Sequence, residues 1–388
     1  MRRKGMRVGV VGCGAAGAAV AILLNRAGHE VVLFEQAQEC RAVGAGFLMQ
    51  PSGMSVLRDL GIYEKVISHA SRIRRLHVIE KSGKDLMELR YEELGSDIFG
   101  AGLHRPVLIE SLIELATKEG VEIRWGTRVE NTRKLPDAWE VAGERFDLLL
   151  VADGARSAMR RVLLGSGYDR GYGWGAHWFI GKNNGVFPSH DLHQIVNGTR
   201  QLAGFLPTGR ELGGNDELLS LFWSVRISDD ESIRSQPLGK WKDQILELCP
   251  LAEKFLGQIE DWEQVITARY GDVSMWRWHR ERLVFLGDAG HAMSPQLGQG
   301  VNLALADASC LAACLAEFPV SQAPPEYSRR RGPVLRYYQL ATRWLTPVFQ
   351  SDYEWIAPLR HVGFRISQRL PLFRKLMTKS MAGMMREI

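Results

Sequence analysis

The stretch from Met6 to Glu35 constrains this chain more than any other, because it contains a complete β-α-β unit with a glycine-rich turn. An apolar run from Met6 to Val11 predicts a strand, and Gly12 to Gly17 reads G-C-G-A-A-G. An apolar helix follows, and Glu30 to Phe34 predicts a second strand. This order of elements turns a common glycine pattern into a specific prediction of a dinucleotide-binding fold.

Each glycine of the turn has a physical task. Gly12 permits the tight turn, Gly14 lets the backbone approach a diphosphate, and Gly17 lets the helix pack on the strand. The diphosphate would sit on the free backbone N–H groups of the helix N-terminus, at Ala15 and Ala16.

Glu35 ends the second strand, about 20 residues beyond the glycines, where a carboxylate can accept both ribose hydroxyls of an adenosine. A carboxylate there would repel a 2′-phosphate. The unit therefore predicts a site for FAD or NAD, and not for NADP.

A second anion site is expected near the other end of the chain. The apolar run Leu283 to Leu286 predicts a buried strand that stops at Gly287-Asp288, and an alanine-rich helix is expected to end near Ala316. Strand, loop and helix N-terminus make a site for negative charge. The residues that we expect to contact a cofactor here are Asp288, Pro295, Gly298, Gln299, Gly300, Val301 and Asn302.

The composition is that of a globular protein, with 45% hydrophobic and 24% charged residues among 388. Five cysteines, without a C-x-x-C pair, indicate reduced thiols and a cytoplasmic location. The glycines interrupt the first apolar run, which argues against a signal peptide, and no transmembrane helix is expected. We expect no metal site and no nucleic-acid partner.

The charge is uneven along the chain. Arg329 to Ile388 contains twelve Lys and Arg against three Asp and Glu, although the whole chain carries only +5. This basic end is typical of a solvated helical surface, and peripheral membrane contact is the alternative.

The middle of the chain has a different residue pattern. Short aromatic strands alternate with Gly, Asn and Pro turns from Gly165 to Trp278, which predicts a mostly antiparallel sheet. Helices are predicted over Ser157 to Leu164 and, beyond Asp307, to the end of the chain. Prolines are expected to break these last helices at Pro319 to Pro325 and at four further positions, Pro333, Pro347, Pro358 and Pro371.

Three fingerprints together resemble one family, the single-component FAD-dependent monooxygenases of the aromatic hydroxylase class, of the p-hydroxybenzoate and salicylate hydroxylase type. The first is Gly12 to Gly17 with Glu35, and the second is the Asp-Gly motif Asp153 to Arg160. The third is the Gly-Asp motif, Gly287 to Gly300. The resemblance covers almost the whole chain, and a single dinucleotide fingerprint also fits this class.

The resemblance implies an α/β fold with three parts. Residues 1–72, 100–165 and 279–320 would form a discontinuous Rossmann-type FAD-binding domain. Residues 73–99 and 166–278 would form a second, mostly antiparallel β-sheet domain for the substrate. Residues 321–388 would form a C-terminal helical segment.

The resemblance also implies the activity. FAD, tightly but not covalently bound, would be reduced by NAD(P)H and react with O2 to a flavin C4a-hydroperoxide, which hydroxylates an aromatic or other electron-rich small molecule. Arg41, Arg105, Val129 and Asp153 match family positions that contact FAD. Pro295 and Gly298 would lie at the reactive ring.

One departure from the family concerns the general base. Many phenol-hydroxylating relatives carry a His-Tyr-Pro run in the central sheet, where this chain reads Gly204-Phe205-Leu206-Pro207. Either the substrate is already activated, as an enol, amine or indole, or another residue serves. The candidate residues are Tyr172, His177, His193 and Arg226.

Other functions of the same FAD-binding fold stay open at this point. A reductase, a halogenase and a non-enzymatic FAD-binding scaffold would share the first motif. The run Trp276 to Arg280 lacks the Ile-Pro of the halogenase motif W-x-W-x-I-P, which disfavours that alternative. The oligomeric state, monomer or homodimer, is equally open.

Overall fold

A computed structural model of the chain describes residues 5–40, 44, 46–160 and 168–385. Its first sheet has six strands in the order β18-β19-β12-β1-β2-β8, parallel except for the β18–β19 pair. Three of the strands, β1, β2 and β19, end close to the predicted bounds. The strands are β1 (Arg7–Val11), β2 (Glu30–Phe34), β8 (Glu122–Arg124), β12 (Leu148–Val151), β18 (His279–Arg280) and β19 (Leu283–Phe285).

Helices pack around this sheet and position the two predicted anion sites. Helix α1 (Ala15–Arg26) contacts both α4 (Arg105–Lys118) and α10 (Gly300–Glu317), and α2 (Pro51–Leu60) contacts α10. Among the described residues, α10 is the one helix long and apolar enough to cross a membrane, but half of it is buried inside the protein. Its apolar character therefore reflects its place in the core.

The second sheet has seven strands in the order β17-β13-β16-β15-β14-β5-β6. Every pair is antiparallel except β14 and β5, which confirms the mostly antiparallel prediction. The strands are β5 (Arg75–Glu80), β6 (Asp85–Arg90), β13 (Tyr168–Lys182), β14 (Asp191–Asn197), β15 (Gln201–Gly209), β16 (Leu218–Arg226) and β17 (Ile266–Ser274).

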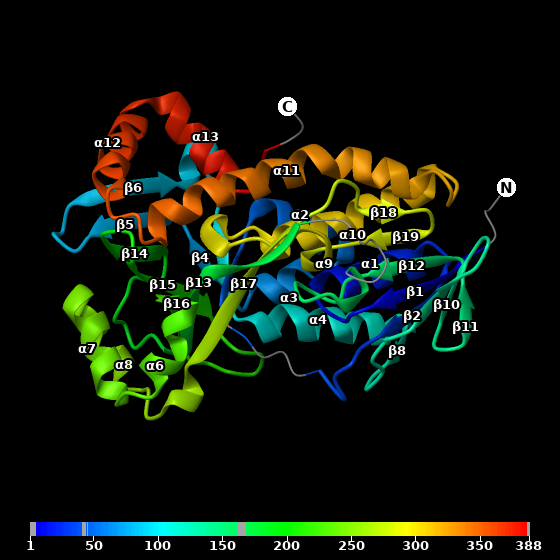
Figure 1. Ribbon diagram of the computed structural model, residues 1–388, viewed down its shortest axis with the longest axis horizontal. Coiled ribbons are helices and arrows are strands. Elements are labelled where there is room, and N and C mark those ends of the chain that lie inside the picture. The colour runs from blue at the N-terminus through cyan, green and yellow to red at the C-terminus, as the bar shows by residue number, and fades with distance from the viewer. Residues whose placement is uncertain (1–4, 41–43, 45, 161–167, 386–388) are drawn as a thin grey trace.

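Helices cover both faces of the second sheet (Figure 1). On one face, Trp241 of α7 (Leu238–Leu248) and Phe255 of α8 (Glu253–Leu256) pack with Phe205. On the other, Leu206 packs with Phe349 and Met381 of the C-terminal helices. These helices are α11 (Ala323–Phe349), α12 (Ile356–Arg369) and α13 (Pro371–Met381).

A small antiparallel sheet joins the two halves. It consists of β3 (Phe47–Met49), β7 (Gly100–Leu103) and β4 (Ser71–Ile73). A Cβ atom on Gly102 would lie 1.8 Å from the Pro207 carbonyl oxygen, so the backbones of β7 and β15 are in direct contact at this glycine. The fold class is confirmed, and the domain boundaries given above stay a prediction.

Some predicted elements were wrong in extent. Helix α11 runs through Pro333 and Pro347, where breaks were expected. Its buried side chains, including Leu335 and Tyr338, hold it along the protein, and this packing outweighs the two lost backbone hydrogen bonds. Strand β14 was not predicted, nor was the three-stranded sheet of β9 (Thr132–Lys134), β10 (Trp139–Val141) and β11 (Glu144–Phe146). Half of the helix expected over Ser157 to Leu164, residues 161–164, lies outside the described residues.

A buried ion cluster ties α11 to the centre of the fold. Asp307 on α10 accepts from His291 at 2.5 Å, from Arg331 at 2.7 Å and from the Gly287 backbone N–H at 2.9 Å. His291 and Asp307 are inaccessible to solvent. These partners hold the pKa of Asp307 below its usual value, against the opposing effect of burial.

Replacing Arg331 with Met should therefore destabilise the protein by about 3 to 5 kcal/mol, because it leaves a buried carboxylate without its cation. Chemical denaturation measures this change. The control is Arg329→Met on the same helix, whose partner Glu326 it meets at the surface, and which should cost far less. Equal losses in the two variants would show that the buried pair contributes nothing specific.

Candidate FAD site and the adjoining pocket

The glycine-rich turn has the geometry that a bound diphosphate needs. A Cβ atom on Gly17 would lie 1.9 Å from the Gly12 carbonyl oxygen, so this glycine is required for close helix packing. A Cβ atom on Gly14 would meet nothing within 4 Å, so the space in front of the helix is open. Helix α1 has no side-chain cap and no acidic residue in its first turn, and its N–H groups are left for a ligand.

Glu35 lies beside this turn at the end of β2. Its carboxylate accepts from the backbone N–H of Cys13 at 2.8 Å and of Ala37 at 2.9 Å, which fixes its orientation. Each oxygen keeps a further lone pair for a ribose hydroxyl. The Thr127 N–H donates to the Glu35 carbonyl oxygen, and this contact brings the loop of Val129 to the same edge of the sheet.

The second helix N-terminus converges on the first through Gly287. This residue has a φ of +57°, and a Cβ atom on it would lie 3.2 Å from both Ala16 of α1 and Ala304 of α10. Asp288 follows at the protein surface, and its Oδ1 is 3.8 Å from where a Cβ of Gly300 would stand. The two predicted anion sites are thus parts of one site.

Two further predicted residues have unsatisfied polar groups here. Among the described residues, Arg105 has no hydrogen bond or ion pair, and burial lowers its pKa while the Asp288 carboxylate opposes that change. The Oδ1 atom of Asp153 is buried without a hydrogen-bond partner, and burial raises the pKa of this carboxyl. Both groups suit the polar phosphates and hydroxyls of a dinucleotide. Arg41 lies outside the described residues.

The loop before α10 is anchored by the C-terminal helices. Ser294 shares a 2.6 Å hydrogen bond with Thr346 of α11, and Gln296 donates to Gln350 at 2.7 Å. Between these anchors Pro295 starts a short 3-10 helix that Gly298 ends in the left-handed region, at a φ of +60°.

The first turn of α10 is held from a second side. Gln299 donates to the Met381 carbonyl oxygen of α13 at 2.5 Å. The side chain of Asn302 bonds Leu48 and Gln50, so only its backbone, like that of Val301, is left for a cofactor. Helix α10 has no acidic residue in its first turn, and its dipole favours negative charge at Gly298 to Gly300.

A pocket of about 750 Å³ lies between β13, β17 and α11. It shares Thr346 and Gln350 with the anchors of the Pro295 loop. Its floor contains a bidentate pair in which Arg343 donates twice to Asp272, at 2.8 Å each. The aromatic residues of its lining are Tyr168, Tyr172, Trp174 and Tyr353.

The four candidate bases are not brought together. Tyr172 lines the pocket, and Arg226 reaches its rim through an ion pair with Asp352. His177 and His193 lie on the opposite face of the sheet. His177 is fully buried, donates a 2.9 Å hydrogen bond to the Asp230 carboxylate, and packs against α7, while burial lowers its pKa. His193 is the register partner of Phe205, whose side chain points to the same helices.

Sequence reasoning missed two residues of this region. The buried hydroxyl of Tyr270 and the buried indole nitrogen of Trp178 have each other as polar neighbours and no hydrogen bond of normal geometry. The buried Tyr172 hydroxyl likewise has only the hydroxyls of Thr346 and Ser294 beside it. Burial raises the pKa of Tyr172 to about 12 and that of Tyr270 still further. The alternation of side chains along a strand would have placed these residues on one face of the sheet. That alternation can be applied only when the pairing of β13 with β17 is known.

The comparisons with known proteins agree with this geometry. The family described as "FAD binding domain" matches residues 5–336. The chain belongs to this family. It is 28% identical over 337 residues to 6-hydroxynicotinate 3-monooxygenase of Pseudomonas fluorescens. The matched region covers 80% of this chain and 83% of that protein. It is 29% identical over 346 residues to aurachin C monooxygenase/isomerase of Stigmatella aurantiaca, across 83% and 84% of the two chains.

A solved structure shares the fold. PqsL of P. aeruginosa in complex with 2-aminobenzoylacetate superposes with a TM-score of 0.82 at 23% identity, over 94% of this chain and all of that one. Together with the family match, the named relatives show that the protein is an NAD(P)H-dependent FAD monooxygenase. The reductase, halogenase and scaffold alternatives are thereby disfavoured.

Replacing Gly300 with Val should abolish turnover of the monooxygenase while leaving the fold and the adenosine end of the site intact. The added side chain would stand in front of α10, where the reactive ring is expected, and a Cβ there would meet only the Asp288 Oδ1 atom, at 3.8 Å. Turnover and FAD fluorescence titration measure the two effects. The matched control is Gly239→Val in the first turn of α7, where a Cβ meets nothing within 4 Å. Wild-type turnover by Gly300→Val would remove this loop from the site.

Proposed function

We propose that the monooxygenase hydroxylates a small aromatic compound whose ring is already activated by an amine, an enol or a ring nitrogen. The substrate would bind in the pocket between β13, β17 and α11. The observation that carries this proposal is the pocket itself, which is lined by aromatic rings and by the Arg343–Asp272 pair. Its lining includes the Tyr172 hydroxyl, which is buried without a hydrogen bond of normal geometry. Buried polar groups are nearly always hydrogen-bonded in native proteins, so this hydroxyl fits a polar group of a ligand.

The FAD site is proposed to use the residues assembled above. Bound FAD would accept a hydride from NAD(P)H and supply the chemistry that activates O2. The N–H groups of α1 and the Arg105 guanidinium would hold the diphosphate, whereas Asp153 and Glu35 would accept hydrogen bonds from hydroxyl groups of the dinucleotide. The first turn of α10 would stabilise negative charge on the reduced ring. The Pro295 loop, which α11 holds rigid, would face that ring.

The substrate chemistry follows from what the pocket provides. The two histidines that could have served as bases face away from it, and the high pKa keeps Tyr172 protonated at neutral pH. The pocket can thus donate hydrogen bonds to a substrate but offers neither histidine as a base. The relatives act on or bind compounds of this kind by name: 6-hydroxynicotinate carries a ring nitrogen, and 2-aminobenzoylacetate carries an amine.

The proposed location is the cytoplasm, where NAD(P)H is available. The structure joins none of the five cysteines in a disulfide, and burial raises the pKa of Cys13 to about 12 and that of Cys249 to about 11. Thiols of this kind are stable under reducing conditions.

The experiment that tests the function is turnover under isotopically labelled O2 with a panel of aminobenzoates, hydroxypyridines, quinolones and plain phenols. We expect NAD(P)H oxidation to be stimulated by the nitrogen-bearing compounds and one labelled oxygen atom to enter the product. Peroxide release is recorded as the control for uncoupled oxidation. Unlabelled product that forms equally fast without O2 would contradict the proposal and favour a reductase.

The pH dependence should follow the substrate. Because the raised pKa of Tyr172 keeps its phenol protonated from about pH 6 to about pH 10, the rate should change only where the substrate itself ionises. Two substrates that differ in their own pKa should give profiles shifted by that difference. A common inflection near neutral pH for both substrates would indicate a protein base instead.

A further inference from the structure

The C-terminal helices present an apolar surface that nothing in the described chain covers. Most of its residues are more than half exposed: Leu359 at 60%, Val362 at 59% and Ile366 at 54% on α12, and Leu372 at 79% and Phe373 at 53% on α13. Leu370 and Leu376 extend it, each at 44%. We define these seven residues as the C-terminal apolar surface. Isolated exposed hydrophobics are ordinary, but a contiguous set marks an interaction site.

The helices cannot turn this surface inward, because their opposite faces are already fixed. Arg360 is buried and donates to the carbonyl oxygens of Gly198 and Val348 at 2.9 Å, and the Phe364 ring stacks on Phe349 at 5.8 Å. These positions lie roughly 100° and 140° around the helix from Leu359, on its inner side. The outward orientation of the α12 stripe therefore follows from its docking.

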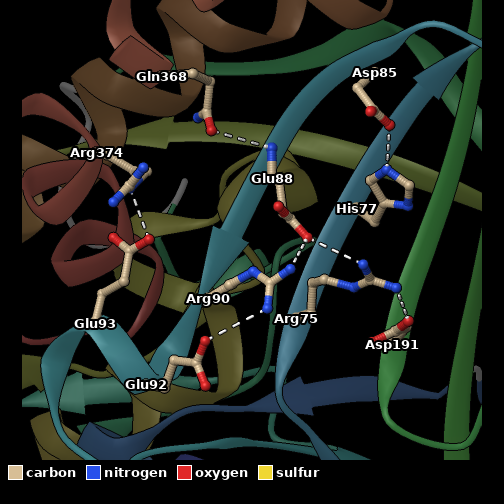
Figure 2. Close-up of polar contacts among 10 residues, drawn as sticks. All are labelled: Arg75, His77, Asp85, Glu88, Arg90, Glu92, Glu93, Asp191, Gln368 and Arg374. Carbon is tan, nitrogen blue, oxygen red and sulfur yellow. Dashed lines mark hydrogen bonds and ion pairs between the residues drawn. The ribbon is translucent and has the colours of Figure 1, made fainter. Parts of the chain in front are cut away.

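The same anchoring continues through α13, as Figure 2 shows. Gln368 of α12 accepts from the Glu88 backbone N–H at 3.4 Å, and Arg374 of α13 forms a 2.7 Å ion pair with Glu93. Both contacts reach the β6 edge of the second sheet. The apolar surface thus runs through the corner where α12 meets α13, on the outside of the molecule (Figure 1).

Cations flank this corner. Arg365 and Arg369 lie on α12 and Lys375 and Lys379 on α13, all exposed, and none has an ion pair within the part of the chain that the structure describes. Residues 329–388 hold twelve basic side chains and only three acidic ones. An amphipathic surface of this kind, with leucine and phenylalanine between lysine and arginine, is typical of helices that lie in the interface of a membrane.

We propose that the corner of α12 and α13 binds the surface of an anionic lipid membrane. The apolar side chains would enter the boundary between headgroups and acyl chains, and the four cations would meet the anionic headgroups. A second copy of this chain fits less well. A two-fold dimer places the same patch against itself, so it would bring these four cations against four identical ones.

The test uses full-length, FAD-loaded protein and sedimentation with lipid vesicles. One set contains phosphatidylcholine alone, and the other an equal mixture of phosphatidylcholine and phosphatidylglycerol. We expect binding to the mixed vesicles, weaker binding to phosphatidylcholine, and a loss of binding as salt screens the charges. Absence of binding to the mixed vesicles, or equal binding to both sets, would overturn the proposal.

Variants separate the two contributions. Leu372→Ser with Phe373→Ser removes apolar contact, and Arg365→Gln, Arg369→Gln, Lys375→Gln and Lys379→Gln together remove charge. Each set should lower the partition coefficient at least about tenfold, with FAD occupancy and turnover of a soluble substrate unchanged. The matched controls are Leu251→Ser, 70% exposed, and Lys240→Gln with Lys254→Gln, all on or beside the helices of the opposite sheet face.

Sedimentation velocity of the free protein resolves the remaining alternative. We expect the same sedimentation coefficient for the wild type and for the Leu372→Ser, Phe373→Ser variant. If the wild type is a dimer that this variant converts to a monomer, and vesicle binding is absent, the surface is an interface between copies and the membrane proposal fails. Variants that bind the mixed vesicles as tightly as the wild type would overturn it as well.

Discussion

The arrangement of the cofactor site depends on one buried carboxylate. Asp307 fixes the backbone of Gly287 and receives His291 and Arg331, so it joins α10, the turn after β19 and α11 in one cluster. A Cβ atom on Gly287 would lie 3.2 Å from both Ala16 and Ala304, so this turn packs between α1 and α10. Because that turn is held in place, two helix N-termini far apart in the sequence lie together, and their partial charges could act on one ligand.

The C-terminal helices hold the loop that precedes α10. Thr346 and Gln350 of α11 hold the Pro295 loop, and Met381 of α13 holds Gln299, so the loop expected beside the reactive ring is set from two sides. Thr346 and Gln350 also line the pocket. The surface proposed to meet a membrane belongs to α12 and α13. The opposite faces of these helices dock on the second sheet, which also carries Tyr270 and Trp178.

The central sheet explains why candidate bases could not be chosen from the sequence. Neighbouring residues on a strand face opposite sides, so His177 and Trp178 have different environments although they are adjacent. His177 packs against the helices of the far face, whereas the buried indole nitrogen of Trp178 lies beside the Tyr270 hydroxyl. The bulge between Gly171 and Gly175 shifts the register of β13 and sets the position of Tyr172, which periodicity in the sequence does not reveal.

The sequence by itself determined the parts of this protein whose physics is local. The β-α-β unit, its glycines and Glu35 were readable because a tight turn and a free helix N-terminus need fixed spacings. The mostly antiparallel character of the second sheet followed from its short aromatic strands. Only the tertiary structure decided which faces of β13 and β17 meet the pocket, that α11 continues through Pro333 and Pro347, and that the N-termini of α1 and α10 lie together. These outcomes depend on register and on packing between distant segments, and such contacts form only when the chain has folded.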